Sequence, residues 1–150
     1  MKLGNAKKII CMLIVVCSLL SYEQACTAKC LLSPIRWQWV DSSADVGVFY
    51  DKKSVRYNAK NRIVSVWIGY YYPSNKACEH PTSYGEHYHY EYTFFDLKYN
   101  MVNVTDWFVR DSDNANVLDS GVYRIGYEII PPESFWEEAL ALIKSHYILK

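Results

Sequence analysis

The strongest strand signal in this chain of 150 residues is Arg62-Ile63-Val64-Ser65-Val66-Trp67-Ile68-Gly69-Tyr70-Tyr71-Tyr72. Successive side chains of a strand point to opposite faces, so one face of this segment is apolar throughout. That face carries Val64, Val66, Ile68, Tyr70 and Tyr72. Trp67 and Tyr71 lie on the other face. Because both faces carry large apolar side chains, we expect this strand to lie in the centre of a sheet.

A second long extended segment is predicted over residues 86–99, after a loop rich in proline, serine and glycine at 73–85. Its even positions are aromatic: Tyr88, Tyr90, Tyr92 and Phe94. Its odd positions are polar: His87, His89, Glu91 and Thr93. This alternation is typical of a half-buried strand. We expect the tyrosines to pack beneath a helix and the polar face to meet solvent.

Shorter extended segments flank these two, at 37–40, 46–50, 54–57, 101–110 and 122–130. Turn-forming residues separate them, and a turn is predicted at Asp119-Ser120-Gly121 before the last segment. Pro131 and Pro132 end that segment because proline has no N–H to donate to a strand partner. The order of the segments favours an antiparallel meander, in which each strand pairs with the next.

A helix is predicted at the end of the chain. Ser134 can cap it, and Glu137 stands three residues later as in a capping box. An apolar stripe follows at helical spacing, made of Trp136, Ala139, Leu140, Ile143 and Tyr147. We therefore predict an α+β fold, an antiparallel β-sheet meander of about six strands with one C-terminal helix packed on a sheet face.

Residues 1–28 have the three-part layout of a cleaved secretory signal peptide. Three lysines precede an apolar run at 9–20, and Cys26-Thr27-Ala28 supplies small residues for cleavage. Twelve residues of helix reach about 18 Å, short of the roughly 30 Å of a membrane core. We expect one mature domain at 29–150, without a transmembrane segment, exported to the cell surface, the periplasm or the medium.

Cleavage after Ala28 would leave two cysteines, Cys30 and Cys78. In an oxidising compartment such a pair favours one disulfide, with two separate thiols as the alternative. Cys26 offers a different interpretation, a lipid-modified N-terminal cysteine. Of the residues before it, Glu23-Gln24-Ala25, only Ala25 fits that pattern.

Charge and motifs argue against several functions. The chain has 16 basic and 16 acidic side chains, so no basic field is available for nucleic acid. It has no Gly-x-Ser-x-Gly nucleophile motif. We expect neither enzymatic activity nor a cofactor.

Four segments occur in a recognisable order along the mature chain. They are Arg36-Trp37-Gln38-Trp39-Val40-Asp41, then Val48-Phe49-Tyr50-Asp51 with Ser54-Val55, then Val64-Ser65-Val66-Trp67-Ile68, and Ile130-Pro131-Pro132-Glu133-Ser134-Phe135-Trp136-Glu137. This order resembles the bacterial surface-adhesin protein E family, over residues 35–143. The resemblance implies an antiparallel sheet crossed by a C-terminal helix. It also implies adhesion to host matrix and serum proteins such as vitronectin, laminin and plasminogen. In the best-known member a disulfide tethers the helix, whereas residues 133–150 contain no cysteine here.

Two sets of residues could form a site. Exposed Trp67 and Tyr71 would make a protein-binding surface, although core packing is the other interpretation of such aromatic residues. His87, His89 and Glu91, with His80 from the preceding loop, make a plausible Zn²⁺ ligand set, although a solvated polar face explains them as well.

The sequence therefore predicts an exported, non-enzymatic binding domain. Its partner would be a host matrix or serum protein, or a component of the cell envelope. The alternative function is a periplasmic or secreted metal-binding protein that uses the His-rich strand. The oligomeric state stays open, since an edge strand could also pair with a copy of itself.

Overall fold

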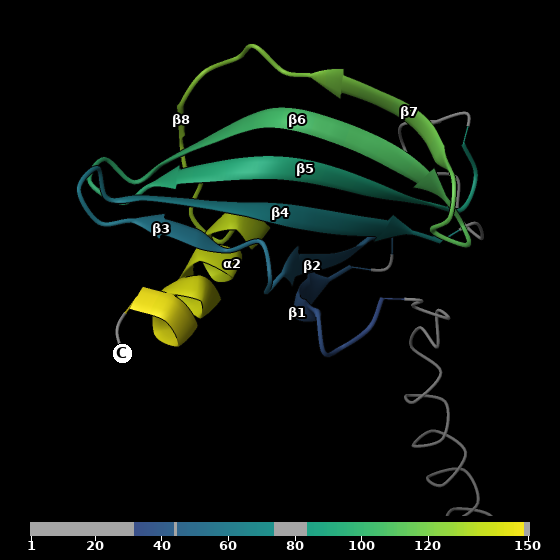
Figure 1. Ribbon diagram of the computed structural model, residues 1–150, viewed down its shortest axis with the longest axis horizontal. Helices are drawn as coiled ribbons and strands as arrows, with labels where there is room; N and C mark the ends of the chain where they lie inside the picture. Colours follow the sequence, from purple (N-terminus) through teal and green to yellow (C-terminus); the bar gives the residue numbers. More distant parts are fainter. Residues whose placement is uncertain (1–31, 44, 74–83, 149–150) are drawn as a thin grey trace, which may run out of the picture. The chain divides into compact units, whose positions relative to one another are not determined.

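The computed structural model describes residues 32–43, 45–73 and 84–148 (Figure 1). Within these residues one antiparallel sheet contains eight strands. They are β1 (Trp37–Ser42), β2 (Gly47–Asp51), β3 (Arg56–Asn58), β4 (Ile63–Tyr72), β5 (His87–Asp96), β6 (Met101–Asp111), β7 (Val117–Val122) and β8 (Glu128–Ile129). Helix α2 (Phe135–Ile143) follows and continues into a π-helical turn, η1 (Lys144–Ile148). The predicted α+β class is confirmed.

The main order of the sheet is β1-β2-β4-β5-β6-β7. β4 pairs with β5 over its whole length, so β2 and β3 share the opposite edge of β4. In the same way β7 and β8 share the outer edge of β6. The two longest pairings, β4 with β5 and β5 with β6, therefore form the middle of the sheet. The predicted central position of residues 62–72 is confirmed.

The core lies between the sheet and α2. β4 contributes Val64, Val66, Ile68 and Tyr70 to it, as the alternation of the sequence predicts. The helix contributes Ala139, Leu140 and Ile143, three residues of its predicted apolar stripe. Tyr147 falls in η1 and stays 41% exposed. We call this side of the sheet the helix face.

The helix begins as predicted. Ser134 Oγ accepts a hydrogen bond from the backbone N–H of Glu137 at 3.3 Å. Glu137 Oε2 in turn accepts from the N–H of Glu133 at 2.8 Å, one residue before the cap. The first bond satisfies a donor that an α-helix leaves without a partner at its start, and the second ties the residue before the cap to the first turn.

The predicted faces of β5 are the wrong way round. Residues directly opposite each other in neighbouring strands share a face, and the register pairs Val64 with Phe95, Ile68 with Glu91 and Tyr70 with His89. The odd positions of β5 therefore lie on the helix face, and the tyrosines lie on the other. His87 is 2% exposed rather than solvated. The more apolar face of β4 turns toward the helix, and the register between β4 and β5 then decides which side chains of β5 share that face.

The end of the sheet also differs from the prediction. A continuous strand was expected over 122–130, but Val122 ends β7, and after it only Glu128–Ile129 pairs among the described residues, as β8. The expected turn at 119–121 lies inside β7 instead. Residues 123–127 consequently leave the sheet between β7 and β8 (Figure 1).

Other sequence-based predictions fall outside the described residues. These are the signal peptide at 1–28, Cys26, and both members of the predicted disulfide, Cys30 and Cys78. Among the residues that are described, no helix combines the length and the apolar character needed to cross a membrane.

Candidate binding face

The side of the sheet away from α2 carries a connected cluster of aromatic rings. We call it the aromatic face and define it by Trp37, Trp67, Tyr90, Tyr92 and Phe108. Tyr90 lies at the centre, with ring centroids 5.3 Å from Trp37 and 4.8 Å from Phe108. Trp67 contacts Phe108 at 5.2 Å and Tyr92 at 5.0 Å. Rings from β1, β4, β5 and β6 thus form one surface.

Gly69 explains how Trp37 reaches this cluster from the far edge of the sheet. Gly69 lies in β4, between the strands that carry Trp37 and Tyr90. A Cβ atom at this position would lie 3.1 Å from the Tyr90 ring and 3.2 Å from the Trp37 ring. The absence of a side chain therefore lets the two rings meet above the backbone of β4.

A pocket of about 300 Å³ opens in the aromatic face. Trp37, Trp67, Tyr90 and Phe108 form its apolar walls. Its polar lining comes from Arg36, Asp51, Arg110 and Asn114. An apolar pocket with a few placed polar groups is the usual form of a binding site. We call it the aromatic pocket.

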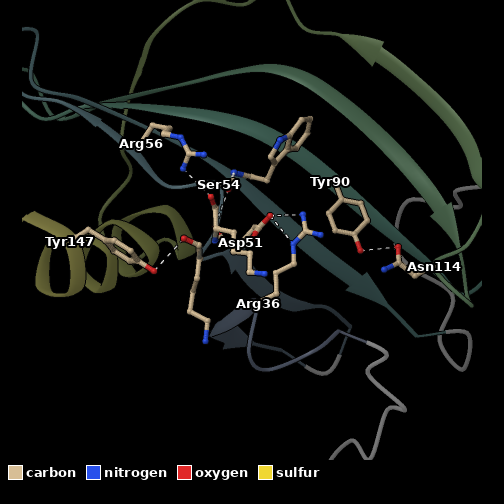
Figure 2. Close-up of polar contacts among 10 residues, drawn as sticks. Arg36, Asp51, Ser54, Arg56, Tyr90, Asn114 and Tyr147 are labelled. Atoms are coloured by element: carbon tan, nitrogen blue, oxygen red, sulfur yellow. Dashed lines mark hydrogen bonds and ion pairs between the residues drawn. The ribbon is translucent and has the colours of Figure 1, made fainter.

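Asp51 and Arg36 form an ion pair at one end of this pocket (Figure 2). Asp51 Oδ2 accepts from Arg36 Nη2 at 2.7 Å and from Nε at 3.0 Å. The Asp51 side chain is 1% exposed, whereas that of Arg36 is 55% exposed. The hydrogen bond to Asp51 is the main reason why the pKa of Arg36 is raised.

A tight turn after β2 holds Asp51 in place. Its Oδ1 accepts from the N–H of Lys53 at 2.9 Å, and its backbone carbonyl accepts from the Ser54 hydroxyl at 2.9 Å. The same hydroxyl oxygen accepts from the N–H of Trp67 at 2.9 Å. The turn therefore fixes the carboxylate and the Trp67 backbone together.

Arg110 lies at the other end of the pocket. Its guanidinium stands 5.5 Å from the centre of the Phe108 ring, and its Nη1 donates to the carbonyl of Asn114 at 3.0 Å. Asn114 also accepts from the Tyr90 hydroxyl at 2.9 Å (Figure 2). Within the described part of the chain, no carboxylate lies within 4 Å of Arg110. A bound anionic group could pair with this cation.

Of the two predicted protein-binding residues, only Trp67 lines the pocket. Trp67 is half-buried. Tyr71 is 5% exposed, packs against Tyr88 at 5.0 Å and donates to Glu86 Oε1 at 2.6 Å. It belongs to the same side of the sheet but is enclosed.

Three residues of the predicted metal set, His87, His89 and Glu91, lie on the helix face. His89 Nε2 is 3.2 Å from Glu91 Oε1. His87 Nδ1 lies 2.6 Å from the carbonyl of Gly85, and its ring stacks on Tyr72 at 4.8 Å. Burial lowers the pKa of His87, which favours the neutral ring. No group of three or more His, Cys, Asp or Glu side chains placed to hold a metal ion occurs in the described segments, and His80 lies outside them.

Sequence reasoning missed most of the aromatic pocket, namely Arg36, Trp37, Phe108, Arg110 and Asn114. The period-two pattern of β6 places Phe108 and Arg110 on one face, but only the register with β5 shows which face that is.

Comparisons of the chain with protein-family models, with curated proteins and with solved structures found no match.

Proposed function

We propose that this chain is an exported, non-enzymatic binding domain that engages a protein ligand through the aromatic pocket. The observation that carries the proposal is the set of half-buried rings, Trp37, Trp67 and Phe108, around a concave surface. Tryptophan and arginine are enriched among the residues that dominate binding energy at protein interfaces. Tryptophan gives a large contact area at a low cost in conformational entropy, because its side chain has only two rotatable bonds.

The charges at the rim favour a ligand segment that carries a carboxylate. Asp51 already has a cation in Arg36, whereas the hydrogen bonds of Arg110 within the described residues go to backbone carbonyls. The charge of Arg110 also helps, after several hydrogen bonds, to lower the pKa of Asp111, but no carboxylate of these residues lies within 4 Å of Arg110. An acidic side chain inserted beside Phe108 would pair with Arg110, and a neighbouring aromatic or aliphatic side chain would fill the apolar part. The resemblance to the surface-adhesin protein E family supports host matrix or serum proteins as the first ligands to test.

Binding to immobilised vitronectin, laminin and plasminogen tests the proposal, with and without a chelator. We expect saturable binding to at least one of them that the chelator leaves unchanged. Trp67→Ala should weaken this binding about tenfold or more, since a central tryptophan contributes about 2 kcal/mol or more. Tyr99→Ala is the matched control, because Tyr99 is 61% exposed in the turn between β5 and β6, away from the pocket.

Two results would count against the proposal. Equal loss of binding in both variants would mean that the aromatic pocket has no special role. Binding that the chelator abolishes, together with a bound metal in the purified protein, would instead support the metal-binding alternative on His87 and His89.

A further inference from the structure

A second pocket, of about 240 Å³, lies on the helix face, on the opposite side of the sheet from the aromatic pocket. β5 and β6 form its floor, the segment between β7 and β8 forms one wall, and the start of α2 forms another. The residues that matter for its chemistry are Glu91, Val102, Val104, Tyr123, Ile125 and Trp136. We call it the Glu91 pocket.

Glu91 supplies the charge of this pocket. Its side chain is 15% exposed. Oε2 accepts from the Tyr70 hydroxyl at 2.9 Å, and Oε1 lies 3.2 Å from His89 Nε2. Among the described residues, no lysine or arginine lies within 4 Å of it. The carboxylate is therefore held in place by hydrogen bonds but lacks a permanent counter-charge.

The other charged residue in the lining is also acidic. Glu128, in β8, faces the pocket from its edge. The charge of Glu91 also acts on Tyr123 in the opposite wall. The pKa of Tyr123 is raised, first by burial and second by the negative charge of Glu91. Two carboxylates, with no cation among the described residues that line the pocket, favour a positively charged occupant.

The walls decide what kind of cation fits. Tyr123 and Trp136 present aromatic rings, whose faces attract cations, and Val102, Val104 and Ile125 present aliphatic surface. Both oxygens of Glu91 already accept hydrogen bonds. The pocket therefore offers a ligand negative charge and apolar contact, but few unoccupied hydrogen-bond acceptors. A quaternary ammonium group, which has no N–H to satisfy, matches that combination.

Two further features belong to the same place. β6 bulges where its pairing with β5 shifts between Glu91 and Thr93, and such bulges often re-aim side chains beside functional sites. Within the described residues, the buried indole N–H of Trp136 has no acceptor at hydrogen-bond distance, and its closeness to the Tyr70 hydroxyl acts to lower the pKa of Tyr70. Burial and Glu91 outweigh that effect and raise the pKa of Tyr70 overall. The indole donor does not itself favour a cation, so the charge preference of the pocket rests on its carboxylates and rings.

We propose that the Glu91 pocket binds a small quaternary ammonium cation from solution. Its volume lies below the roughly 300–1,000 Å³ of pockets for drug-sized ligands, which restricts the occupant to a small molecule. The two carboxylates would repel the phosphate of a phosphocholine lipid, so a free cation is favoured over a lipid headgroup. The site is independent of the aromatic pocket and of the proposed protein ligand.

Choline and its neutral carbon isostere, 3,3-dimethylbutan-1-ol, test this proposal on the wild-type protein by calorimetry. The two molecules have the same shape and differ in charge. We expect choline to bind about tenfold or more tightly than the alcohol. Equal affinities, or no binding of choline, would overturn the proposal without any variant having to fold.

Variants then locate the site. Glu91→Gln should remove most of the preference for choline, whereas Glu138→Gln, on the exposed side of α2, should keep it. Trp67→Ala should also keep it, so failure of the protein-binding proposal and failure of this one are distinguishable. Equal preference in the wild type and Glu91→Gln would overturn the assignment. Co-sedimentation with phosphatidylcholine vesicles, without binding of free choline, would do so as well.

Discussion

Gly69 is the residue on which the aromatic pocket depends most. Its missing side chain leaves room for the Trp37 and Tyr90 rings to touch above β4. Gly69→Ala should therefore lower the free energy of unfolding by about 1–3 kcal/mol and push the two rings apart. Urea unfolding measures the first effect, and a change in tryptophan fluorescence in the native state reports the second.

Gly47→Ala is a matched control for Gly69→Ala. Its Cβ would lie 3.2 Å from the Trp39 ring, a similarly close contact. Trp39 is 46% exposed and can move outwards, whereas Tyr90 is 3% exposed and cannot. Equal losses of stability in the two variants would contradict this account of Gly69.

His87 should make the stability of the fold depend on pH. Its pKa in the folded chain is lowered, mainly by burial, so the unfolded chain takes up the proton first as pH falls. The contribution of His87 to the free energy of unfolding is present in full above the pKa of histidine in the unfolded chain, about 6.5. It is lost as pH falls toward the lower pKa of His87 in the folded chain. We expect the midpoint of urea unfolding to drop between about pH 7.5 and pH 5.5.

His87→Gln, whose side chain stays neutral, should flatten this part of the pH profile. His146→Gln serves as the comparison, because His146 is exposed. Its Nδ1 lies 3.1 Å from the Tyr50 hydroxyl, so the slopes of the two pH profiles are compared and not the absolute stabilities. If the profile of His87→Gln remained as steep as that of the wild type, burial of His87 would not be the cause.

At the level of the elements, α2 is attached to the sheet by packing within the described residues. Leu140 is 3% exposed and Ile143 is fully buried. Leu140→Ala should lower the free energy of unfolding by about 2–5 kcal/mol, because it removes buried apolar volume and leaves a cavity. Leu142→Ala makes the same substitution on the same helix at a partly buried position and should cost clearly less. A similar loss in both would show that the helix does not dock through Leu140.

The strands also show what sequence reasoning can and cannot reach. The two faces of β4, the β6 segment and the helix start with Ser134 and Glu137 follow from local patterns, and all were predicted. The faces of β5 were assigned wrongly because Tyr88 and Tyr90 are more apolar than His87 and His89. Pairing with β4 decides the faces of β5, and register is information that one strand does not contain.

At the scale of the whole molecule, the helix and the sheet share a single core. Tyr50, Ile68 and Leu140 come from three elements and belong to the same cluster. We therefore expect one cooperative unfolding transition, with coincident midpoints by far-ultraviolet circular dichroism and by tryptophan fluorescence. Loss of helix at a lower urea concentration than the loss of the tryptophan signal would contradict a shared core.

Neither pocket could be predicted from the sequence, because both depend on how distant segments are arranged in the whole molecule. The aromatic pocket joins Trp37 of β1 to Tyr90 of β5, two strands that are not neighbours in the sheet. The Glu91 pocket needs the departure of residues 123–127 from the sheet, where a continuous strand was predicted. Local patterns assign residues to faces, but pockets arise where distant segments meet on a face.

The outer edges of the sheet are made of several short or irregular strands, and this affects how readily the protein aggregates at high concentration. Along them lie only short or irregular strands in the described part of the chain: β3 with three residues, β8 with two, and β1 and β7 with a register shift each. A growing fibril needs a long, regular row of unpaired backbone groups on which further copies can add. By interrupting that row at every edge, the fold can display a wide aromatic surface while resisting edge-to-edge aggregation.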